Sequence, residues 1–516
     1  MKTPSLKLVR DFNQEELVRN INTIVEQFIF AIPHVACLSE STTPVELAYY
    51  RSKKYFSTED SVDDDVLDSA ARDKWLSSDW ERGPNMVIRS SAVRRVLYRA
   101  RLLLQQWTAD FYSHSLTNFD ITSGETFQSA KGKTSVYQKL KDKKYWTVTA
   151  DCVDMASKLV WSNRGLRVCA SAFIRRDTTK SYRKRLTKFL ISRNVPRQKL
   201  GFECFKVLLR LHVFSIVLGS RLETVPKDNT NRRTINVEPW FNVMCQRSIG
   251  LSLRKVSAQV GNDLEFGQDD HKTMIADRNY ATIDFSAASD SMLPSVVKFM
   301  FSPPIVKNLE STRSIYTRYD KYDWHMPTLF SCMGNGYTFE LMTLTLLAIA
   351  RTVDPSSRVY GDDVIVRNRV AKLFVESCQS IGFSVNADKS FIGSKFRESC
   401  GAFYHDDHGY LTSFKLERCS DICDAIVLTN KLFVLAREYP EYREVHNKVL
   451  SLWPSLHQAN PPQDQTSLSG WVWSERVCIG EDERALLNNV KTVLGTRLVD
   501  LQLEMREIRV SNCKST

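Results

Sequence analysis

Residues 359–366 read Val-Tyr-Gly-Asp-Asp-Val-Ile-Val, two short runs of β-branched or aromatic residues separated by a Gly-Asp turn. This pattern predicts a tight β-hairpin with Asp362 and Asp363 at its tip. Adjacent carboxylates are poor strand formers and repel each other, so a cation is expected to neutralise them. The expected cation is Mg2+, with Mn2+ as the alternative ion. Taken alone, the motif also has an ordinary interpretation as a turn carrying a solvated acidic pair.

A further acidic residue lies upstream in an apolar setting. Residues 281–285 read Ala-Thr-Ile-Asp-Phe, a short strand of the buried type in which Asp284 is the one charged residue. An unpaired carboxylate there would cost several kcal/mol, so it needs either a hydrogen-bond network or a shared metal ion. Two Mg2+ ions about 3.5–4 Å apart, bridged by carboxylates, are the general device for phosphoryl transfer. We therefore expect Asp284 to meet Asp362 and Asp363.

A glycine-rich loop lies between these two segments. Residues 331–340 read Ser-Cys-Met-Gly-Asn-Gly-Tyr-Thr-Phe-Glu, and a long apolar helix follows. Gly334 and Gly336 allow close backbone approach, while Asn335 offers a polar group to a sugar or base; a bare helix-entry loop is the alternative. A helical pattern and a short strand then lead to Lys389. The order of elements predicts an α+β fold with a ferredoxin-like antiparallel sheet that carries the Asp residues on one face.

Four ordered stretches, at 283–291, 333–341, 360–363 and 396–401, resemble the palm motifs of an RNA-dependent RNA polymerase. More narrowly, they are similar to the replicase catalytic subunit of the leviviruses, which are positive-strand RNA bacteriophages. The segment 224–239 is similar to the basic nucleotide-binding strand pair of that family.

This resemblance implies roles for individual residues. Asp284, Asp362 and Asp363 would hold the metals, and Lys389 would act as general acid toward pyrophosphate. The chain departs from the family at Thr230, where a Lys is usual, and at Arg232, where an Asp is usual, so positive charge is moved rather than lost. The remaining nucleotide-binding candidates are Lys227, Arg232, Arg233, Gly334, Asn335 and Gly336, with Asp290 and Asn335 reading the ribose 2′-hydroxyl.

The resemblance also implies a right-hand polymerase architecture. Residues 1–225 are expected to form mostly helical, basic fingers, and residues 226–415 the palm, with a finger insertion near 301–329. Residues 416–516 are expected to form a helical thumb. Helical patterns are predicted at 93–107, 202–218 and 481–510, and the clearest loop at 461–465.

Charge and composition agree with a polyanion partner. The 516-residue chain has a formal net charge of +12, with 43% hydrophobic and 25% charged residues, as in an ordinary globular protein. Basic residues are densest between 175 and 199, where Tyr182 and Phe189 interleave with them, as in a surface that tracks RNA phosphates. A solvated helix face is the alternative, and the acidic stretch 59–68 is expected to be exposed. The RNA-binding candidates are Arg175, Arg176, Arg183, Lys184 and Arg185.

The twelve cysteines raise the alternatives of zinc and disulfides. No signal peptide opens the chain and no apolar stretch approaches about 18 residues, so we expect a cytosolic protein with reduced thiols and no membrane contact. Cys419 and Cys423, preceded by Cys400, His405 and His408, could supply zinc ligands. Because no paired Cys-x2-Cys knuckle is present, buried reduced cysteine is the favoured interpretation.

The sequence therefore predicts an enzyme that copies RNA from ribonucleoside triphosphates. A mitovirus or narnavirus replicase is the nearest alternative, and a reverse transcriptase or a catalytically dead RNA-binding scaffold are the others. By resemblance, the protein would act in the cytoplasm of an infected bacterium. Its expected partners there are host translation elongation factors and a small-subunit ribosomal protein.

Overall fold

The computed structural model divides the chain into two compact units, which are described separately. Unit 1 contains Met1–Val62, Asp228–Thr230 and Leu411–Thr516, and unit 2 contains Asp63–Lys227 and Asn231–Tyr410. The structure describes residues 13–57, 63–81, 86–88, 90–111, 124–129, 135–320 and 322–453. The helix predicted at 481–510 and the loop predicted at 461–465 lie outside these ranges.

Unit 1 is helical where it is described. Its helices are α1 (Gln14–Ala31), α2 (Pro44–Tyr55), α16 (Ile422–Glu438) and α17 (Arg443–Leu452). Thr43 and Glu46 form a capping box that starts α2. The core joins helices from distant parts of the sequence, because α1 packs against α16 and α17. Residues 1–62 therefore belong to the same compact unit as residue 411 onward, whereas the sequence placed them with the rest of 1–225.

Unit 2 is built around an antiparallel sheet in the order β5-β10-β9. Its strands are β5 (Tyr280–Ile283), β9 (Arg358–Tyr360) and β10 (Asp363–Arg367). The register places Val364 opposite Ile283 and Asp363 opposite Tyr360. Beyond Asp284 the chain continues as β6 (Phe285–Ser286), which pairs with β11 (Ser384–Val385). Asp284 thus lies at the junction between two pairings, next to the β9–β10 hairpin.

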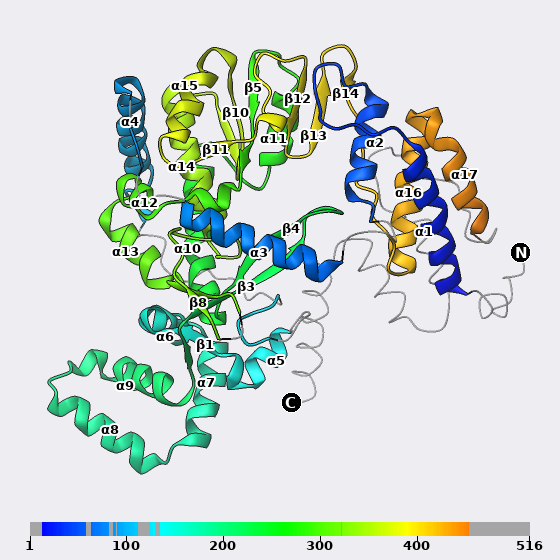
Figure 1. Cartoon of the computed structure of the whole chain (residues 1–516). Helices are drawn as coiled ribbons and strands as arrows, with labels where there is room; N and C mark the ends of the chain where they lie inside the picture. The colour runs from blue at the N-terminus through cyan, green and yellow to red at the C-terminus, as the bar shows by residue number, and fades with distance from the viewer. Residues whose placement is uncertain are drawn as a thin grey trace, which may run out of the picture. The chain divides into compact units, whose positions relative to one another are not determined.

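Helices cover this sheet and bury its apolar face. The buried cluster includes side chains of the sheet and of α14 (Thr338–Val353), α15 (Asn368–Gln379), α4 (Ser91–Trp107) and α10 (Trp240–Gln259). Helix α14 contacts α4, α10 and α15, which explains why its sequence is apolar on nearly every side. Helices α12 (Pro294–Met300) and α13 (Pro303–Thr312) adjoin this core (Figure 1).

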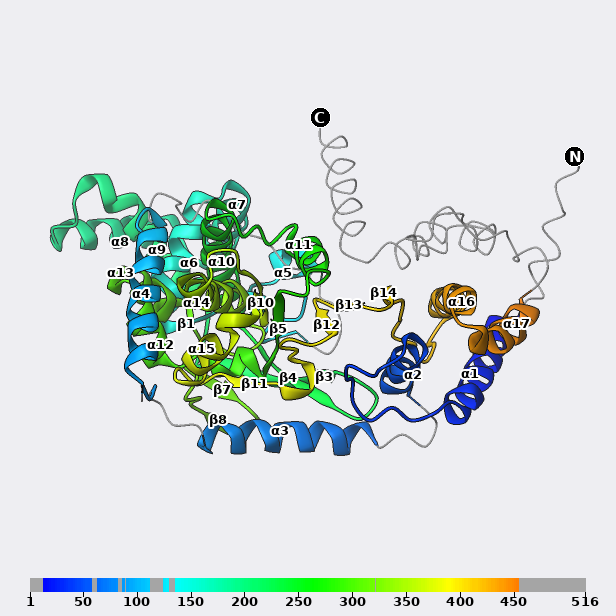
Figure 2. The same cartoon turned by 90° about the horizontal axis from the view of Figure 1, so that it is seen from above.

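A second sheet of unit 2 has the order β4-β3-β7-β8. Its strands are β3 (Gly219–Pro226), β4 (Arg232–Val237), β7 (Tyr316–Arg318) and β8 (Trp324–His325). The segment 301–329 therefore returns to the β3–β4 pair, because β7 pairs in parallel with β3. Helix α3 (Asp64–Glu81) lies along this sheet (Figure 2). The buried Asp79 fixes its end by accepting hydrogen bonds from Thr328 and lying 2.8 Å from His325 Nε2.

A helical region surrounds the short parallel pair β1 (Thr147–Thr149) and β2 (Ser215–Val217). Its helices are α5 (Val136–Lys141), α6 (Val153–Ser162), α7 (Arg164–Asp177), α8 (Lys180–Ser192) and α9 (Arg197–His212). The prediction of one helix over 202–218 was wrong at its end. Helix α9 stops at His212 because residues 215–217 pair with β1 instead. Helices α8 and α9 form a hairpin at the edge of unit 2 (Figure 1).

A third antiparallel sheet consists of β12 (Phe396–Ser399), β13 (Ala402–His405) and β14 (Gly409–Tyr410). Cys400 and Gly401 form the two-residue turn between β12 and β13, with φ angles of 52° and 78°. Helix α11 (Gly267–Met274) contacts both strands. None of the helices in the described ranges is long and apolar enough to cross a membrane.

Candidate active site

The acidic hairpin adopts the predicted conformation. Gly361 and Asp362 form the turn, and Asp363 is the first residue of β10. Gly361 has a φ of 64°, and its N–H donates to Thr343 Oγ1 at 3.0 Å. A Cβ at this position would lie 2.6 Å from the ring of Phe339, so the turn requires glycine on both grounds. The glycine thus fixes where the two carboxylates emerge.

Asp284 is held from the opposite strand by two residues beyond β11. Asn386 Nδ2 donates to Asp284 Oδ2 at 2.7 Å, and Asn386 N donates to Asp284 O at 2.9 Å. Ser390 Oγ accepts from Asp284 N at 3.1 Å. These contacts leave the second carboxylate oxygen, Oδ1, for another group. Sequence reasoning missed Asn386 and Ser390, although both flank the predicted Lys389.

The charges around Asp284 identify its neighbours. Burial raises the pKa of Asp284 above its usual value, and the negative charge of Asp362 raises it further. The positive charges of Lys389 and Lys227 and the Asn386 hydrogen bond act in the opposite direction. The structure therefore brings Asp284 and Asp362 together with two predicted lysines.

The carboxyl group of Asp363 also has a raised pKa. Burial raises its pKa to about 7, and the nearby charges of Glu398, Asp362 and Asp284 contribute. The backbone N–H of Cys400 donates to this carboxylate and opposes the shift, and the Cys400 thiol is hydrogen-bonded to it as well. Glu398 is a fourth acidic residue of the site that sequence reasoning missed. Glu398 belongs to the stretch 396–401, which was identified as a motif from the sequence without a role for any of its residues.

The donor set suits a hard divalent cation. Carboxylate oxygens are what Mg2+ and Mn2+ prefer, and a bound cation would relieve the repulsion that raises the pKa of Asp284 and Asp363. In the part of the chain that the structure describes, no group of three or more His, Cys, Asp or Glu side chains already converges on one point. The carboxylate oxygens thus match the ligands that a divalent cation prefers, although the side chains would have to turn toward a bound ion.

The glycine-rich loop packs against the end of β4. Gly334 has a φ of 100°, and a Cβ there would lie 2.3 Å from Asn236 O. Asn236 N donates to Met333 O at 2.7 Å, which ties the strand to the loop. Gly336 N donates to Gln246 Oε1 of α10 at 3.0 Å. Asn335 lies between these anchors and is buried.

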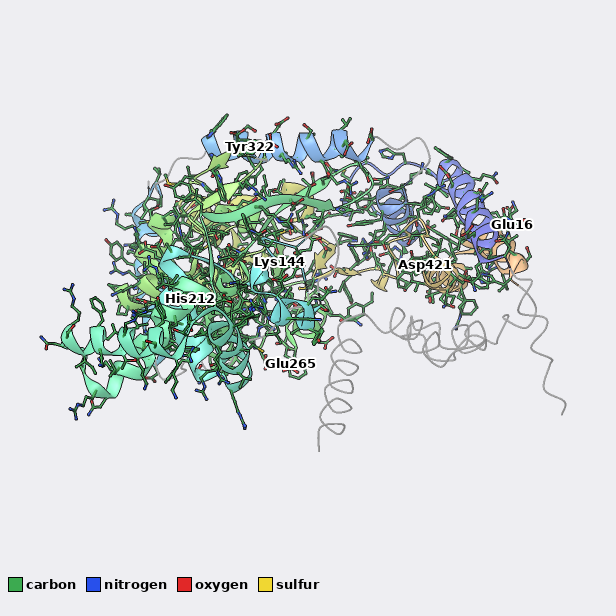
Figure 3. All side chains as sticks on the ribbon, turned by 90° about the horizontal axis from the view of Figure 1, so that it is seen from below. Glu16, Lys144, His212, Glu265, Tyr322 and Asp421 are labelled. Carbon is green, nitrogen blue, oxygen red and sulfur yellow. The ribbon has the colours of Figure 1, made fainter. Side chains whose placement is uncertain are left out.

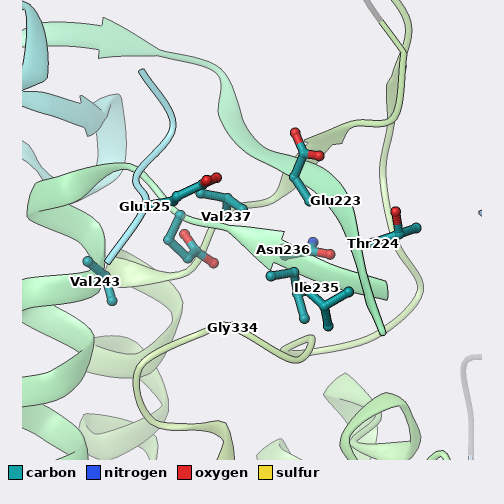
Figure 4. A pocket seen from close by; sticks show the side chains of 10 residues that line it. Glu125, Glu223, Thr224, Ile235, Asn236, Val237, Val243 and Gly334 are labelled. Carbon is teal, nitrogen blue, oxygen red and sulfur yellow. The ribbon is translucent and has the colours of Figure 1, made fainter. Parts of the chain in front are cut away.

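A cavity of about 510 Å³ lies between the strand pair and this loop (Figure 4). Asn236 Nδ2 donates to Thr317 Oγ1 at 2.7 Å, while its Oδ1 has no hydrogen-bond partner among the described residues. The wall is acidic and apolar rather than basic, so it suits hydrogen-bond donors better than phosphate. The lining residues are Glu125, Glu223, Thr224, Val225, Ile235, Asn236, Val237, Glu238, Val243 and Gly334.

The basic strand pair separates its cations into two kinds. Lys227 and Arg233 are exposed at the β3–β4 end. Arg232 is mostly buried and forms ion pairs with Asp64 and Asp68 of α3. Its positive charge is therefore already matched by two carboxylates from the acidic stretch that was expected only to be exposed.

Asp290 lies near the glycine loop. It belongs to the 3-10 turn η5 (Ala288–Ser291), which Ala287 enters with a φ of 48°. The negative charge of Asp290 acts on the buried thiol of Cys332, whose pKa is raised chiefly by burial. The two residues predicted to read the ribose, Asp290 and Asn335, thus lie on segments that approach each other around Cys332.

The basic segment 175–199 begins in the last turn of α7 and continues through α8 to the start of α9, and nitrogen-tipped side chains project from the α8–α9 hairpin (Figure 3). Arg176 pairs with Asp177 at 3.1 Å, and Arg183 donates to Thr178 O at 2.8 Å. Arg175, Lys184 and Arg185 are exposed, and none of them has an ion pair within the described ranges. Two of the five predicted RNA-binding residues therefore already bind neighbouring groups of the protein, and the other three are exposed without an ion pair in the described ranges.

The cysteines do not form a zinc centre in the described ranges. Cys419 is buried in unit 1, and burial raises the pKa of its thiol to about 12. Its backbone pairs with Asn22, which donates to Cys419 O and accepts from Cys419 N, both at 2.9 Å.

The described chain thus combines an acidic hairpin, an Asp-bearing strand and a basic strand pair, and comparison with known proteins identifies its family. The family model "RNA replicase, beta-chain" matches residues 85–461, and the chain belongs to this family. The RNA-directed RNA polymerase beta chain of Escherichia phage MS2 is 34% identical over 203 residues, 37% of each chain. The corresponding beta subunits of Enterobacteria phage SP and Escherichia virus Qbeta are each 32% identical, over 48% and 47% of this chain.

These alignments cover less than half of each relative, namely 37% for MS2, 46% for SP and 43% for Qbeta. Among solved structures, the RNA-dependent RNA polymerase of a human picorbirnavirus is similar over 56% of this chain and 65% of its own. Its sequence identity is 12% and the TM-score is 0.33, which is too low to define the fold.

Proposed function

We propose that this chain is an RNA-directed RNA polymerase that replicates a positive-strand RNA genome. It would add ribonucleotides to a growing 3′ end and release pyrophosphate. The observation that carries the proposal is the meeting of Asp284 with the Asp362-Asp363 hairpin, beside Lys389 and Lys227, in a member of the RNA replicase family. A dead scaffold would have no reason to retain this cluster of mutually repelling carboxylates.

Each residue of the site has a role in this proposal. Asp284, Asp362 and Asp363 would hold Mg2+ or Mn2+, and such ions activate an attacking hydroxyl and stabilise a leaving pyrophosphate. Lys389 would donate a proton to the departing pyrophosphate. Asn386 and Ser390 orient Asp284 through the hydrogen bonds described above.

The nucleotide would enter past the β3–β4 pair. Lys227 and Arg233, which are exposed, would neutralise its triphosphate. Arg232 would instead hold the strand pair against α3, since Asp64 and Asp68 already match its charge. Gly334 and Gly336 shape the loop that presents Asn335, which together with Asp290 would read the ribose.

The architecture in this proposal is a right-hand polymerase with a ferredoxin-like palm. Three antiparallel pairings support the palm: β11 with β6, β5 with β10, and β10 with β9. The helix α14 lies between β6 and β9 in the chain, and α15 lies between β10 and β11. Within unit 2, the helical region around β1 and the strands β7 and β8 of the 301–329 insertion would belong to the fingers, and β4 to the palm; α16 and α17 of unit 1 would belong to the thumb.

The partners in this proposal are RNA, nucleotides and further protein subunits. RNA would be bound by Lys184, Arg185 and Arg175 on and before α8, with Arg176 and Arg183 beside them. The name "beta chain" carried by the relatives supports assembly with further subunits. By resemblance, these would be host translation elongation factors and a small-subunit ribosomal protein, in the cytoplasm of an infected bacterium.

A primer-extension assay tests the proposal. Asp362→Asn should lower nucleotide incorporation on the order of a thousandfold or more, because the neutral amide removes a charge needed to hold the metal. The matched control is Asp388→Asn, an exposed carboxylate in the short turn η6 (Ala387–Lys389) before Lys389, which should retain activity.

RNA and DNA templates with both ribo- and deoxyribonucleotides distinguish the alternatives. Extension on RNA with ribonucleotides is expected, whereas extension with deoxyribonucleotides would indicate a reverse transcriptase. Incorporation by Asp362→Asn at the wild-type rate would show that the acidic hairpin is not the catalytic centre. Failure of the wild-type protein to extend any primer would favour the scaffold.

A further inference from the structure

The buried Glu238 has no role in the chemistry described so far. It follows β4 directly and is 6% exposed. Burial raises the pKa of its carboxyl to about 7. Because a buried carboxylate is costly unless its oxygens are hydrogen-bonded, its contacts indicate what it does.

Three side chains from three different segments bind this carboxylate. Ser314 Oγ, in the loop before β7, donates to Glu238 Oε2 at 2.5 Å. Gln246 of α10 and Asn335 of the glycine loop are also hydrogen-bonded to it. Gln246 in turn accepts from Gly336 N at 3.0 Å and donates to Thr312 O at 2.9 Å. Glu238 thus binds Asn335 itself, while Gln246 binds both Glu238 and the residue after Asn335, Gly336.

These contacts fix the orientation of the Asn335 amide. Its Oδ1 accepts from Tyr337 N at 3.1 Å, so its nitrogen is the end that donates to Glu238. A side-chain amide has two N–H groups and two acceptor lone pairs. Its two N–H groups are occupied by Glu238 and by the phenol oxygen of Tyr337, and one lone pair of Oδ1 is taken, which leaves one Oδ1 lone pair to accept a hydrogen bond from a ligand hydroxyl.

We propose that Glu238 is a positioning residue that holds the Asn335 amide in the one orientation able to bind a ribose 2′-hydroxyl, and so helps to select ribonucleotides. This inference rests on the proposed function, in which Asn335 reads the ribose. It goes beyond that proposal by assigning the selectivity to a residue of the nucleotide-binding strand pair.

The position of Glu238 supports this assignment. Its side chain lines the same 510 Å³ cavity as Asn236 and Gly334, so a ligand bound there would meet the strand and the loop together. Asn236 N also holds Met333 O, one residue before Gly334. Movement of β4 and movement of the glycine loop are therefore coupled through two adjacent contacts, at residues 236 and 238.

Selectivity should also depend on pH. The groups that face Glu238 are Ser314, Gln246, Asn335, Arg313, Tyr337, Cys152 and Cys332. The thiols and the phenol have pKa values raised by their surroundings, and the guanidinium stays charged, so none of them changes charge between pH 6 and 8. Protonated Glu238 would carry an O–H donor and accept fewer hydrogen bonds, which loosens Asn335.

The test compares kcat/KM for each ribonucleoside triphosphate with that for its 2′-deoxy counterpart. Glu238→Leu should lower this ratio by about tenfold, as expected for the loss of one orienting hydrogen bond, mainly through a higher KM for the ribonucleotide. Glu238→Gln retains a side-chain acceptor, so it should keep most of the ratio. Between pH 8 and 6 the ratio should fall in the wild type and stay constant in Glu238→Gln.

Two further variants make the result specific. Asn335→Ala should lower the ratio at least as much as Glu238→Leu. Asp354→Asn changes another buried carboxylate, which caps Arg367 N at 2.9 Å in a different part of the palm, and it should leave the ratio unchanged. If Glu238→Leu does not fold, as judged by thermal unfolding, the pH profile of Glu238→Gln decides.

The outcomes separate the two proposals. If Asn335→Ala lowers the ratio while Glu238→Leu does not, the positioning role is overturned and ribose reading by Asn335 stands. If the ratio in Glu238→Gln falls with pH as steeply as in the wild type, the positioning role is likewise overturned. If neither Asn335→Ala nor Glu238→Leu changes the ratio, ribose reading by Asn335 fails as well. Loss of all incorporation in Asp362→Asn tests the polymerase assignment independently.

Discussion

Asp363 lies at the start of β10 with three other carboxylates close to it. Its pKa of about 7 means that the folded protein, without a bound cation, holds this group partly protonated at neutral pH. The cost is inherent in the function proposed here, because the charges that repel one another in the absence of metal are those that would attract it. A site of this kind is expected to be less stable than its neutral variants.

This cost should appear as a pH dependence of stability in the metal-free protein. The folded pKa of Asp363 is raised above the usual unfolded value of about 3.9, so between these values the folded state binds the extra proton and stability falls as pH rises. We expect Asp363→Asn to raise the melting temperature by a few °C at pH 8 and much less near pH 4.5. Thermal unfolding in a chelator buffer, across this range, measures the difference.

The control for this measurement is Asp388→Asn, because Asp388 is an exposed carboxylate. Its effect should be small at both pH values. Equal stabilisation by Asp363→Asn at pH 4.5 and pH 8 would mean that the carboxylate is not held in a destabilising environment. Added Mg2+ should abolish the advantage of the variant at pH 8 if the ion binds where we propose.

At the level of single residues, the sequence was sufficient for the acidic hairpin and insufficient for what surrounds it. Asp362 and Asp363 could be placed because a Gly-Asp turn between β-branched runs has few other conformations. Asn386, Ser390 and Glu398 could not, since their roles depend on the pairing of β11 with β6 and on the contacts of β12 with β5 and β10, across long stretches of chain. Glu238 was missed for the same reason.

At the level of elements, the strand pair β3–β4 shows how a local reading of charge can differ from the fold. Arg232 stands in a run of cations, and on sequence alone it belongs with Lys227 and Arg233. The structure joins it to Asp64 and Asp68 of α3, which also anchors the sheet at Asp79. The sequence predicts only that part of α3 is an exposed acidic stretch, because a local count of charges does not specify the strand against which a helix packs.

The α8–α9 hairpin allows a direct test of the RNA surface. Lys184→Gln with Arg185→Gln removes two exposed cations, and should reduce the slope of log affinity against log salt for single-stranded RNA by about 1.4, at about 0.7 per phosphate contact. The weakening should be similar for all sequences, because phosphate contacts carry no sequence information. Filter binding or fluorescence anisotropy at several salt concentrations measures the slope.

The matched control removes two nearby cations that already have partners, one in the last turn of α7 and one on α8. Arg176 is paired with Asp177 and Arg183 with Thr178, so Arg176→Gln with Arg183→Gln should change the slope less. An identical change in both double variants would show that the hairpin contributes only general charge. No change in either would show that it is a solvated face.

At the scale of the whole molecule, unit 1 combines helices from two distant parts of the sequence, which helical patterns alone do not reveal. The apolar residues of α1, α2, α16 and α17 predict that each helix buries one face, but they do not predict which element covers it. The structure pairs them with one another in unit 1. This is why the sequence grouped residues 1–62 with the segments that follow them rather than with residue 411 onward.

Asn22 provides the sharpest test of that pairing. Its buried amide bonds to both the N–H and the C=O of Cys419, so Asn22→Ala would leave two buried backbone groups without partners. We expect a loss of about 2–3 kcal/mol in the stability of unit 1, measured by chemical denaturation. Thr23→Ala, its exposed neighbour, should cost far less, because its hydroxyl bonds only within α1. Equal stability of the two variants would mean that α1 does not pack against the segment around Cys419.

The same variant tests the role of unit 1 separately from that of the candidate active site, because Glu238 and the three Asp residues belong to unit 2. If unit 1 serves as a thumb, Asn22→Ala should shorten the products of RNA synthesis at elevated temperature while single-nucleotide addition persists.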